Sequence, residues 1–160
     1  MSGSINDNIG SALICSRLFA YIMRLCFLYE GQYPPYWKWF GTAFSQLKYA
    51  GDFEDAMQSG LAAREWQERE KYLSQAYIAL GKLHNQSRLA QKIEPGVMRY
   101  YTRPFMVVDT QKYKSALRAE IKSESVKLLP PNIGSIDQIS DQTDFLENND
   151  IRLRINGVWG

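Results

Sequence analysis

The sequence predicts an all-α fold, a single domain over residues 1–160 built as a bundle of about five to seven helices. Two observations indicate this class: several stretches carry apolar residues at helical spacing, and only one short run, residues 105–108, is typical of a strand. The third observation is size, because 160 residues with 45% hydrophobic side chains can bury a core without metal or disulfide. We expect residues 1–8 and 148–160 to be loosely ordered.

Residues 9–29 form the most apolar stretch, and we expect them to be a helix buried in the middle of the bundle. Arg17 and Arg24 interrupt it; they are seven residues apart and share one face. A central arginine costs about 2.5–3.5 kcal/mol on membrane-insertion scales, and no cleavage site follows the stretch. The prediction is therefore a cytoplasmic protein without a membrane partner, in which both arginines need partners inside the fold.

Further helices follow, separated by turn signals. Pro34 and Pro35 end the first helix, because proline lacks the backbone N–H and restricts the residue before it. Asp109 is placed to cap a later helix. The run at 105–108 has no obvious partner strand. The helices expected after Pro35 span residues 36–49, 52–57, 62–88, 110–121, 125–129 and 135–146.

Charge and cysteine content exclude several functional classes. Nineteen Lys and Arg against seventeen Asp and Glu leave a net charge of +2, which gives no support for a nucleic-acid partner. Cys15 and Cys26 are about 16 Å apart along one helix, which is too far for a disulfide, so we expect both to be reduced and buried. Two thiols and the single histidine, His84, do not make a zinc site, and we expect no metal and no cofactor.

Four sets of polar side chains have chemistry that suits ligand binding. Lys38 and Trp39 lie in an aromatic run at 36–40, which offers a cation and a stacking surface for a phosphorylated ligand; the alternative is core packing. Arg103 precedes Pro104 in a rigid turn, where a guanidinium can bind a phosphate through two hydrogen bonds; the alternative is a structural salt bridge.

The other two sets are acidic and imidazole groups. Asp137 and Asp141 share a helical face with Asp144, and we favour ion pairs with Arg17, Arg24 or Arg103 over a magnesium site. His84 follows Leu80 by four residues on an apolar face, which is typical of a core-edge histidine with satisfied hydrogen bonds. No nucleophile or carboxylate beside it indicates catalysis.

Motifs of catalysis are missing from the sequence. It contains no phosphate-binding glycine loop, and the Gly-Ser pairs at residues 10–11 and 134–135 have no Asp-x-Asp after them. A nucleotidyltransferase site needs such paired carboxylates on strands to hold its two metal ions.

Three stretches together nevertheless resemble a known family. It is an uncharacterised bacterial family, domain-of-unknown-function family 4037, which usually follows a nucleotidyltransferase-like domain. The resemblance spans roughly residues 17–146. It rests on residues 24–30 with 36–44, on 103–105, and on 134–138 with 141–144.

The resemblance implies a helical C-terminal module arranged as in aminoglycoside nucleotidyltransferases. There the helical half supplies acceptor contacts and dimer surface, while the other half holds metal and nucleotide. We expect the present chain to lack that other half, with its Asp-x-Asp motif, and to have no turnover by itself.

Our functional hypothesis is the substrate- or acceptor-binding half of a nucleotidyltransferase-like protein. Its partners would be a nucleotidyltransferase domain, in cis or in trans, and a small polar or phosphorylated ligand. The alternative is a structural module that forms a homodimer or contacts another protein without any ligand. The side chains expected to line a shared polar cleft are Lys38, Trp39, His84, Arg103, Asp137 and Asp141.

Overall fold

The protein is mostly helical, with one small hairpin. The structure, a computed structural model, describes residues 2–129 and residue 150, which fall into two units, Met1–Glu120 and Ile121–Gly160. The second unit contributes α6 (Glu124–Lys127). The first unit contains a 3₁₀-helix η1 (Ser2–Ile5), α1 (Asn8–Tyr29), α2 (Trp37–Phe44), α3 (Gly51–Ala62), α4 (Trp66–Ser87), β1 (Met98–Arg99), β2 (Met106–Val107) and α5 (Thr110–Ala119).

Helix α1 begins one residue before the predicted start, at Asn8. The Asp7 carboxylate accepts a hydrogen bond of 2.8 Å from the backbone N–H of Gly10, which caps the first turn. The helix ends at Tyr29, ahead of Gly31, whose φ of 69° lies in the left-handed region that glycine adopts without strain. Local signals therefore explain both ends of α1.

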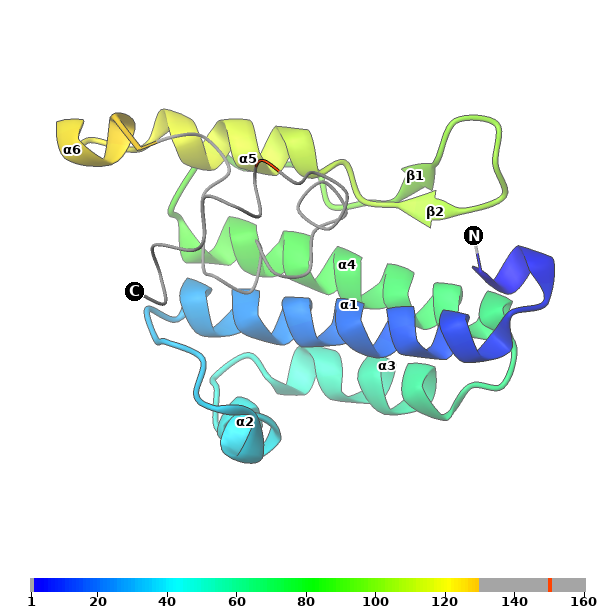
Figure 1. The fold of residues 1–160 in the computed structure, drawn as a ribbon. Coiled ribbons are helices and arrows are strands. Elements are labelled where there is room, and N and C mark those ends of the chain that lie inside the picture. The colour runs from blue at the N-terminus through cyan, green and yellow to red at the C-terminus, as the bar shows by residue number, and fades with distance from the viewer. Residues whose placement is uncertain (1, 130–149, 151–160) are drawn as a thin grey trace. The chain divides into compact units, whose positions relative to one another are not determined.

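Helices α1, α3 and α4 run side by side and enclose the core (Figure 1). The buried side chains of α1 recur at helical spacing and meet those of the other two helices. Helix α3 approaches α1 closely at Gly60, where an added Cβ would lie 2.6 Å from Cζ of Phe19. The core is formed by Cys15, Phe19, Ile22, Cys26, Phe27, Phe40, Phe44, Leu47, Ala50, Phe53, Ala56, Met57, Leu73, Ala76 and Leu83.

The prediction that α1 is buried on all sides is wrong. Ile9 and Leu13 are 78% and 67% exposed, because α3, α4 and η1 cover one side of the helix and leave another open. Within the described residues, α1 is also a helix long and apolar enough to cross a membrane by length and composition. One third of its most apolar window is buried, and core helices of soluble proteins pass the same test.

Helix α2 is shorter than predicted, since it ends at Phe44 instead of continuing to Tyr49. The carboxylate of Glu30 accepts hydrogen bonds of 3.1 Å from the backbone N–H groups of both Lys48 and Tyr49. These bonds hold the chain in a turn between α2 and α3. The contact spans nearly twenty residues, so no local pattern in the sequence announces it.

The extended run at 105–108 has a partner, which the sequence analysis did not find. Met106 and Val107 of β2 pair with Arg99 and Met98 of β1 in an antiparallel hairpin. The Glu70 carboxylate of α4 accepts a 2.8 Å hydrogen bond from the backbone N–H of Met106, which ties the hairpin to the helices.

Arg69 of α4 is only 6% exposed. Its guanidinium donates to the Ser11 hydroxyl at 3.0 Å and to the Arg64 carbonyl at 2.8 Å, and so joins the starts of α1 and α4. At the N-terminus, η1 is formed, and Gly3 is buried against Trp66.

Two expectations for later helices are confirmed. Asp109 caps α5 by accepting from the backbone N–H of Gln111 at 3.2 Å, and α6 occupies the position of the expected turn at 125–129. The predicted helix at 135–146 lies outside the described residues.

Candidate functional site

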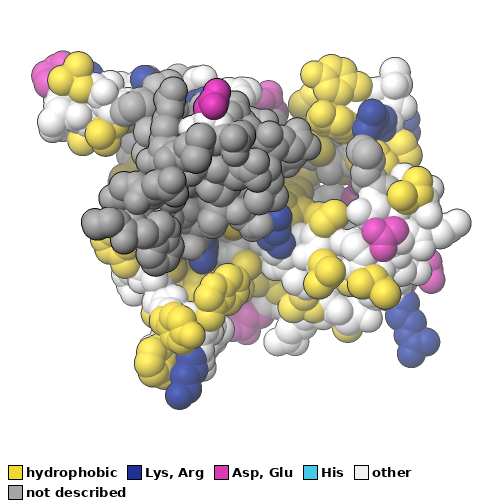
Figure 2. Space-filling model, in the orientation of Figure 1, with side chains coloured by type: hydrophobic (Ala, Val, Ile, Leu, Met, Phe, Trp, Pro, Cys, Tyr) yellow, Lys and Arg dark blue, Asp and Glu magenta, His cyan; other side chains and the backbone are white. Residues whose placement is uncertain are grey.

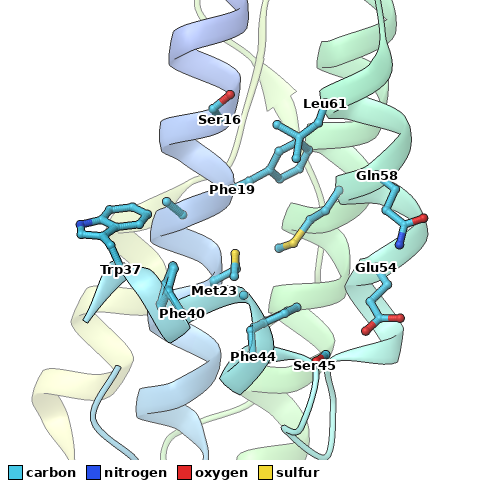
Figure 3. A pocket seen from close by; sticks show the side chains of 13 residues that line it. Ser16, Phe19, Met23, Trp37, Phe40, Phe44, Ser45, Glu54, Gln58 and Leu61 are labelled. Carbon is cyan, nitrogen blue, oxygen red and sulfur yellow. The ribbon is translucent and has the colours of Figure 1, made fainter. Parts of the chain in front are cut away.

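One concave feature of the first unit is an open hollow of about 510 Å³ between α1, α2 and α3, which we call the apolar hollow (Figure 3). Its volume lies within the roughly 300–1,000 Å³ that small-molecule sites occupy. The residues that line it are Ser16, Phe19, Ala20, Met23, Trp37, Phe40, Gly41, Phe44, Ser45, Glu54, Met57, Gln58 and Leu61.

Aromatic side chains of α2 form one wall of the hollow. Phe40 and Phe44 are four residues apart and buried, while Trp37 is 60% exposed at the edge. Trp37 meets Phe40 edge-on at 5.1 Å, and Phe40 stacks on Phe27 of α1 at 5.7 Å. These ring contacts hold the wall in place without closing it.

The second wall comes from α1, through residues that share one face of the helix. Ser16, Ala20 and Met23 lie three or four residues apart and, with Phe19, face α2 and α3. The Arg24 guanidinium lies next to this wall, 5.4 Å from the ring centroid of Trp37. Arg24 itself does not line the hollow.

The third wall is the α3 face made by Glu54, Met57, Gln58 and Leu61, which are again three or four residues apart. Glu54 is half-buried. Its carboxylate makes no hydrogen bond and no ion pair with any residue that the structure describes. Figure 3 shows Glu54 and Gln58 on the α3 side of the hollow, across from Trp37.

This composition suits binding through apolar contact more than acid–base chemistry. Most lining atoms are carbon and sulfur, and the polar groups lie at the edges, as in many ligand sites. Among residues 2–129 and 150, no group of three or more His, Cys, Asp or Glu side chains is arranged to hold a metal ion.

The two cysteines are free and buried, as predicted. Burial raises the pKa of the Cys15 thiol to about 11 and that of the Cys26 thiol to about 12. A thiol with such a pKa is a poor nucleophile at neutral pH, because the thiolate is the reactive form.

Lys38 and Trp39 lie on α2 but do not line the hollow. Trp39 is 58% exposed, and the Lys38 ammonium lies 5.7 Å from its ring centroid. Tyr36 meets the same ring edge-on. Figure 2 shows hydrophobic side chains gathered over α2 with a basic side chain beside them. The expected pairing of aromatic ring and cation is present, and ligand binding there stays a prediction.

His84 does not face a polar cleft, because its side chain is completely buried. Its Nδ1 lies 3.1 Å from the Tyr29 hydroxyl and its Nε2 lies 3.0 Å from the Gln91 carbonyl oxygen. A carbonyl only accepts, so Nε2 donates to Gln91. The ring also packs edge-on against Tyr113. The geometry matches the satisfied core histidine that the spacing indicates.

Arg103 lies in the loop between β1 and β2, away from α2 (Figure 1). Its backbone N–H donates to the Tyr100 carbonyl at 3.1 Å, which closes the turn. Asp137 and Asp141 lie outside the described residues. The structure therefore does not bring Lys38, Trp39, His84 and Arg103 together into one cleft: two are on α2, one is in the core and one is in the hairpin loop.

Arg17 and Arg24 of α1 both stack on aromatic rings. Arg17 donates from Nε to the Tyr21 hydroxyl at 2.8 Å, and Arg24 lies over Trp37. The expected role of Asp137 and Asp141 as their counter-ions stays a prediction.

Neither Glu54 nor the apolar hollow was predicted from the sequence. One signal was available: Glu54 lies three and seven residues before Met57 and Leu61, so an acid shares a helical face with apolar residues. The signal is weak, because the same spacing occurs at the edge of any amphipathic helix.

Comparison with known proteins found one partial match. A family model described as Domain of unknown function (DUF4037) matches residues 2–40, which include the α1 wall of the hollow and the start of its α2 wall. The chain is thus similar to that family over its first quarter. The comparisons with curated proteins and with solved structures, nucleotidyltransferases included, found no match.

Proposed function

We propose that this chain is a non-catalytic binding module and that the apolar hollow is its binding site. The observation that carries the proposal is an open space of about 510 Å³ walled by Phe19, Trp37 and Phe40. Apolar surface that the fold leaves open is available to bury a ligand, at roughly 25 cal/mol per Å² removed from water. The proposal keeps the substrate-binding role expected from the sequence and moves its site from a polar cleft to the hollow.

The partner in this proposal is a nucleotidyltransferase-like domain, in cis or in trans, in the bacterial cytoplasm. Its support is the sequence resemblance, together with the family match over residues 2–40. The coding sequence upstream of Met1 tests the cis form. A Gly-Ser pair followed by Asp-x-Asp on a strand pattern is expected there, and an upstream stop codon in frame would exclude that form.

Filling the hollow tests the site directly. Gly41 lines it, and an added Cβ there would have no atom within 4 Å, so Gly41→Phe adds a ring from an open position on the wall of the hollow. Gly51→Phe is the matched control, because Gly51 is equally open and lies outside the hollow. The probe is Nile red, a neutral apolar dye that brightens out of water.

The wild type and Gly51→Phe are expected to bind the dye alike, and Gly41→Phe to bind it at least about five-fold more weakly, since the ring replaces buried dye contacts. Equal binding by all three proteins, or no binding by the wild type, would overturn the assignment of the hollow. Circular dichroism confirms that each variant is folded.

The second candidate function is homodimerisation, which the exposed face of α1 favours. Ile9 and Leu13 are four residues apart and both are more than 60% exposed. Sedimentation velocity at several concentrations tests it. A dimer that Leu13→Gln dissociates and Gly41→Phe does not would support this function, whereas a monomer at every concentration would exclude it.

A further inference from the structure

Glu54 is the one charged residue among those that line the apolar hollow. It is half-buried, and its carboxylate has no hydrogen-bond or ion-pair partner in the part of the chain that the structure describes. No buried side-chain oxygen among the described residues lacks a partner, so the Glu54 carboxylate, which has none, reaches water at the edge of the hollow. A donor from outside the fold can therefore bind it without displacing an internal partner.

The other residues that line the hollow indicate which kind of ligand can bring a hydrogen-bond donor to Glu54. Phe19, Met23, Phe40, Phe44 and Met57 offer apolar and aromatic contact without further hydrogen-bonding groups. A ligand that fills this space needs an apolar body. Its polar end is then matched to the α3 side, where Glu54 lies with Gln58 one helical turn further on.

Charge sets the orientation of such a ligand. Glu54 is the one charged residue among those that line the hollow, and its carboxylate attracts a cation at the α3 side. A positively charged end is thus favoured at that edge of the hollow.

We propose that the apolar hollow binds a small amphiphilic amine, with its apolar body among the rings and its ammonium group on the Glu54 carboxylate. This rests on the proposed function, since it names the ligand class for the same site. A charge-assisted hydrogen bond of this kind is about twice as strong as a neutral one. The preference for an ammonium end is therefore the property to measure.

Three ligands that share one apolar body separate the two proposals: 4-phenylbutylamine, 4-phenylbutanol and 4-phenylbutyrate. Each is titrated against Nile red bound to the full chain. The amine is expected to displace half of the dye at a concentration about tenfold lower than the alcohol, and the carboxylate to be weakest, since ion pairing adds to equal apolar contact.

Two variants assign the preference to Glu54. Glu54→Gln is expected to bring the amine to the level of the alcohol and to leave the alcohol unchanged. Asp55→Asn, on the exposed neighbour that does not line the hollow, is expected to keep the tenfold preference. A preference that persists in Glu54→Gln would overturn the assignment, because another group would then select the amine.

Failure of this inference and failure of the proposed function give different results. Equal displacement by amine and alcohol in the wild type overturns the amine preference and leaves the hollow as a binding site. Loss of dye binding altogether overturns the proposed function as well. A concentration-dependent dimer that Gly41→Phe dissociates also overturns the inference, because a second copy of the chain would then occupy the hollow.

Discussion

Two aromatic regions of the first unit differ in how their polar and apolar groups are satisfied. Around His84, the rings of Tyr29 and Tyr113 pack against the imidazole, and both ring nitrogens have partners within 3.1 Å. Around α2, the rings of Trp37 and Trp39 are more than half exposed beside an open hollow. In the first region the polar groups and rings contact one another, and we call it the closed region. In the second, which we call the open region, apolar surface is left available to a ligand.

The difference indicates which residues stabilise the fold and which are available for binding. Beside His84, the Asn85 side chain bonds both the N–H and the carbonyl of Ile93, at 2.9 and 2.8 Å, and holds the chain that leaves α4. No buried side-chain nitrogen or oxygen among the described residues lacks a partner. Polar residues of this region therefore stabilise the fold, whereas the Glu54 carboxylate beside the hollow has no partner within the described chain and reaches water.

One of the largest effects is expected from His84→Ala, which removes the ring at the centre of the closed region. It leaves the Tyr29 hydroxyl and the Gln91 carbonyl without their partner and creates a cavity, so the free energy of unfolding should fall by about 3 kcal/mol. Urea denaturation measures it. Lys82→Ala, an exposed site on the same helix, is the control and should change it by less than about 0.5 kcal/mol. A similar small change in His84→Ala would show that the histidine cluster is not structural.

Two glycine substitutions, one in the packed core and one in the open region, should change the free energy of unfolding in opposite directions. Gly60→Ala forces a Cβ against Phe19 and should destabilise the fold by about 1–3 kcal/mol. Gly41→Ala adds a Cβ in open space within α2 and should stabilise it by about 0.5–1 kcal/mol, because alanine loses less entropy than glycine in a helix. Thermal unfolding of both variants checks the prediction, which two changes of the same sign would refute.

The closed region should also be sensitive to alkaline pH. Burial raises the pKa of Tyr29 from 10.0 to about 12, so the folded state holds this proton more tightly than the unfolded chain does. The contribution of this raised pKa to the free energy of unfolding is complete below pH 10 and is lost as the pH rises towards 12. The free energy of unfolding should fall over this range, and less steeply in Tyr29→Phe. Tyr36→Phe, on the exposed segment before α2, is the control; equal slopes in all three proteins would contradict the assignment.

The smallest effect is expected from Trp39→Ala in the open region. The side chain is 58% exposed and does not line the hollow, so the free energy of unfolding should change by less than about 0.5 kcal/mol. Binding of Nile red should also be unchanged. Phe40→Ala in the same helix removes a buried ring and should cost about 3 kcal/mol or more. Similar losses in the two variants would mean that Trp39 packs in the core.

Much of the helical framework was predictable because its signals are local. The apolar run and Asp7 define α1, Asp109 defines the start of α5, and the prolines after Gly31 separate α1 from α2. The end of α2 was not predictable, since it depends on Glu30 binding backbone N–H groups eighteen and nineteen residues away. The hairpin was missed for a similar reason: β1 has two residues, too few for a recognisable alternation.

The candidate site was less predictable than the fold. The residue types in Tyr36-Trp37-Lys38-Trp39 pointed to α2 as a binding region, but not to which rings would face the hollow. Of these, Trp37 lines it and Trp39 does not. Lys38, His84 and Arg103 lie on α2, in the core and in the hairpin loop, and residue type says nothing about which of three distant elements will meet.

By itself, the sequence determined that this protein is mostly helical, that its cysteines are too far apart to pair, and where α1 and α5 begin, since periodicity, spacing and capping act within one or two helical turns. Only the tertiary structure decided which side of α1 is covered, that His84 is enclosed, and that α1, α2 and α3 leave a hollow beside Glu54. Burial is a property of what lies opposite a side chain, and in this fold the opposing residues come from helices that are distant in sequence.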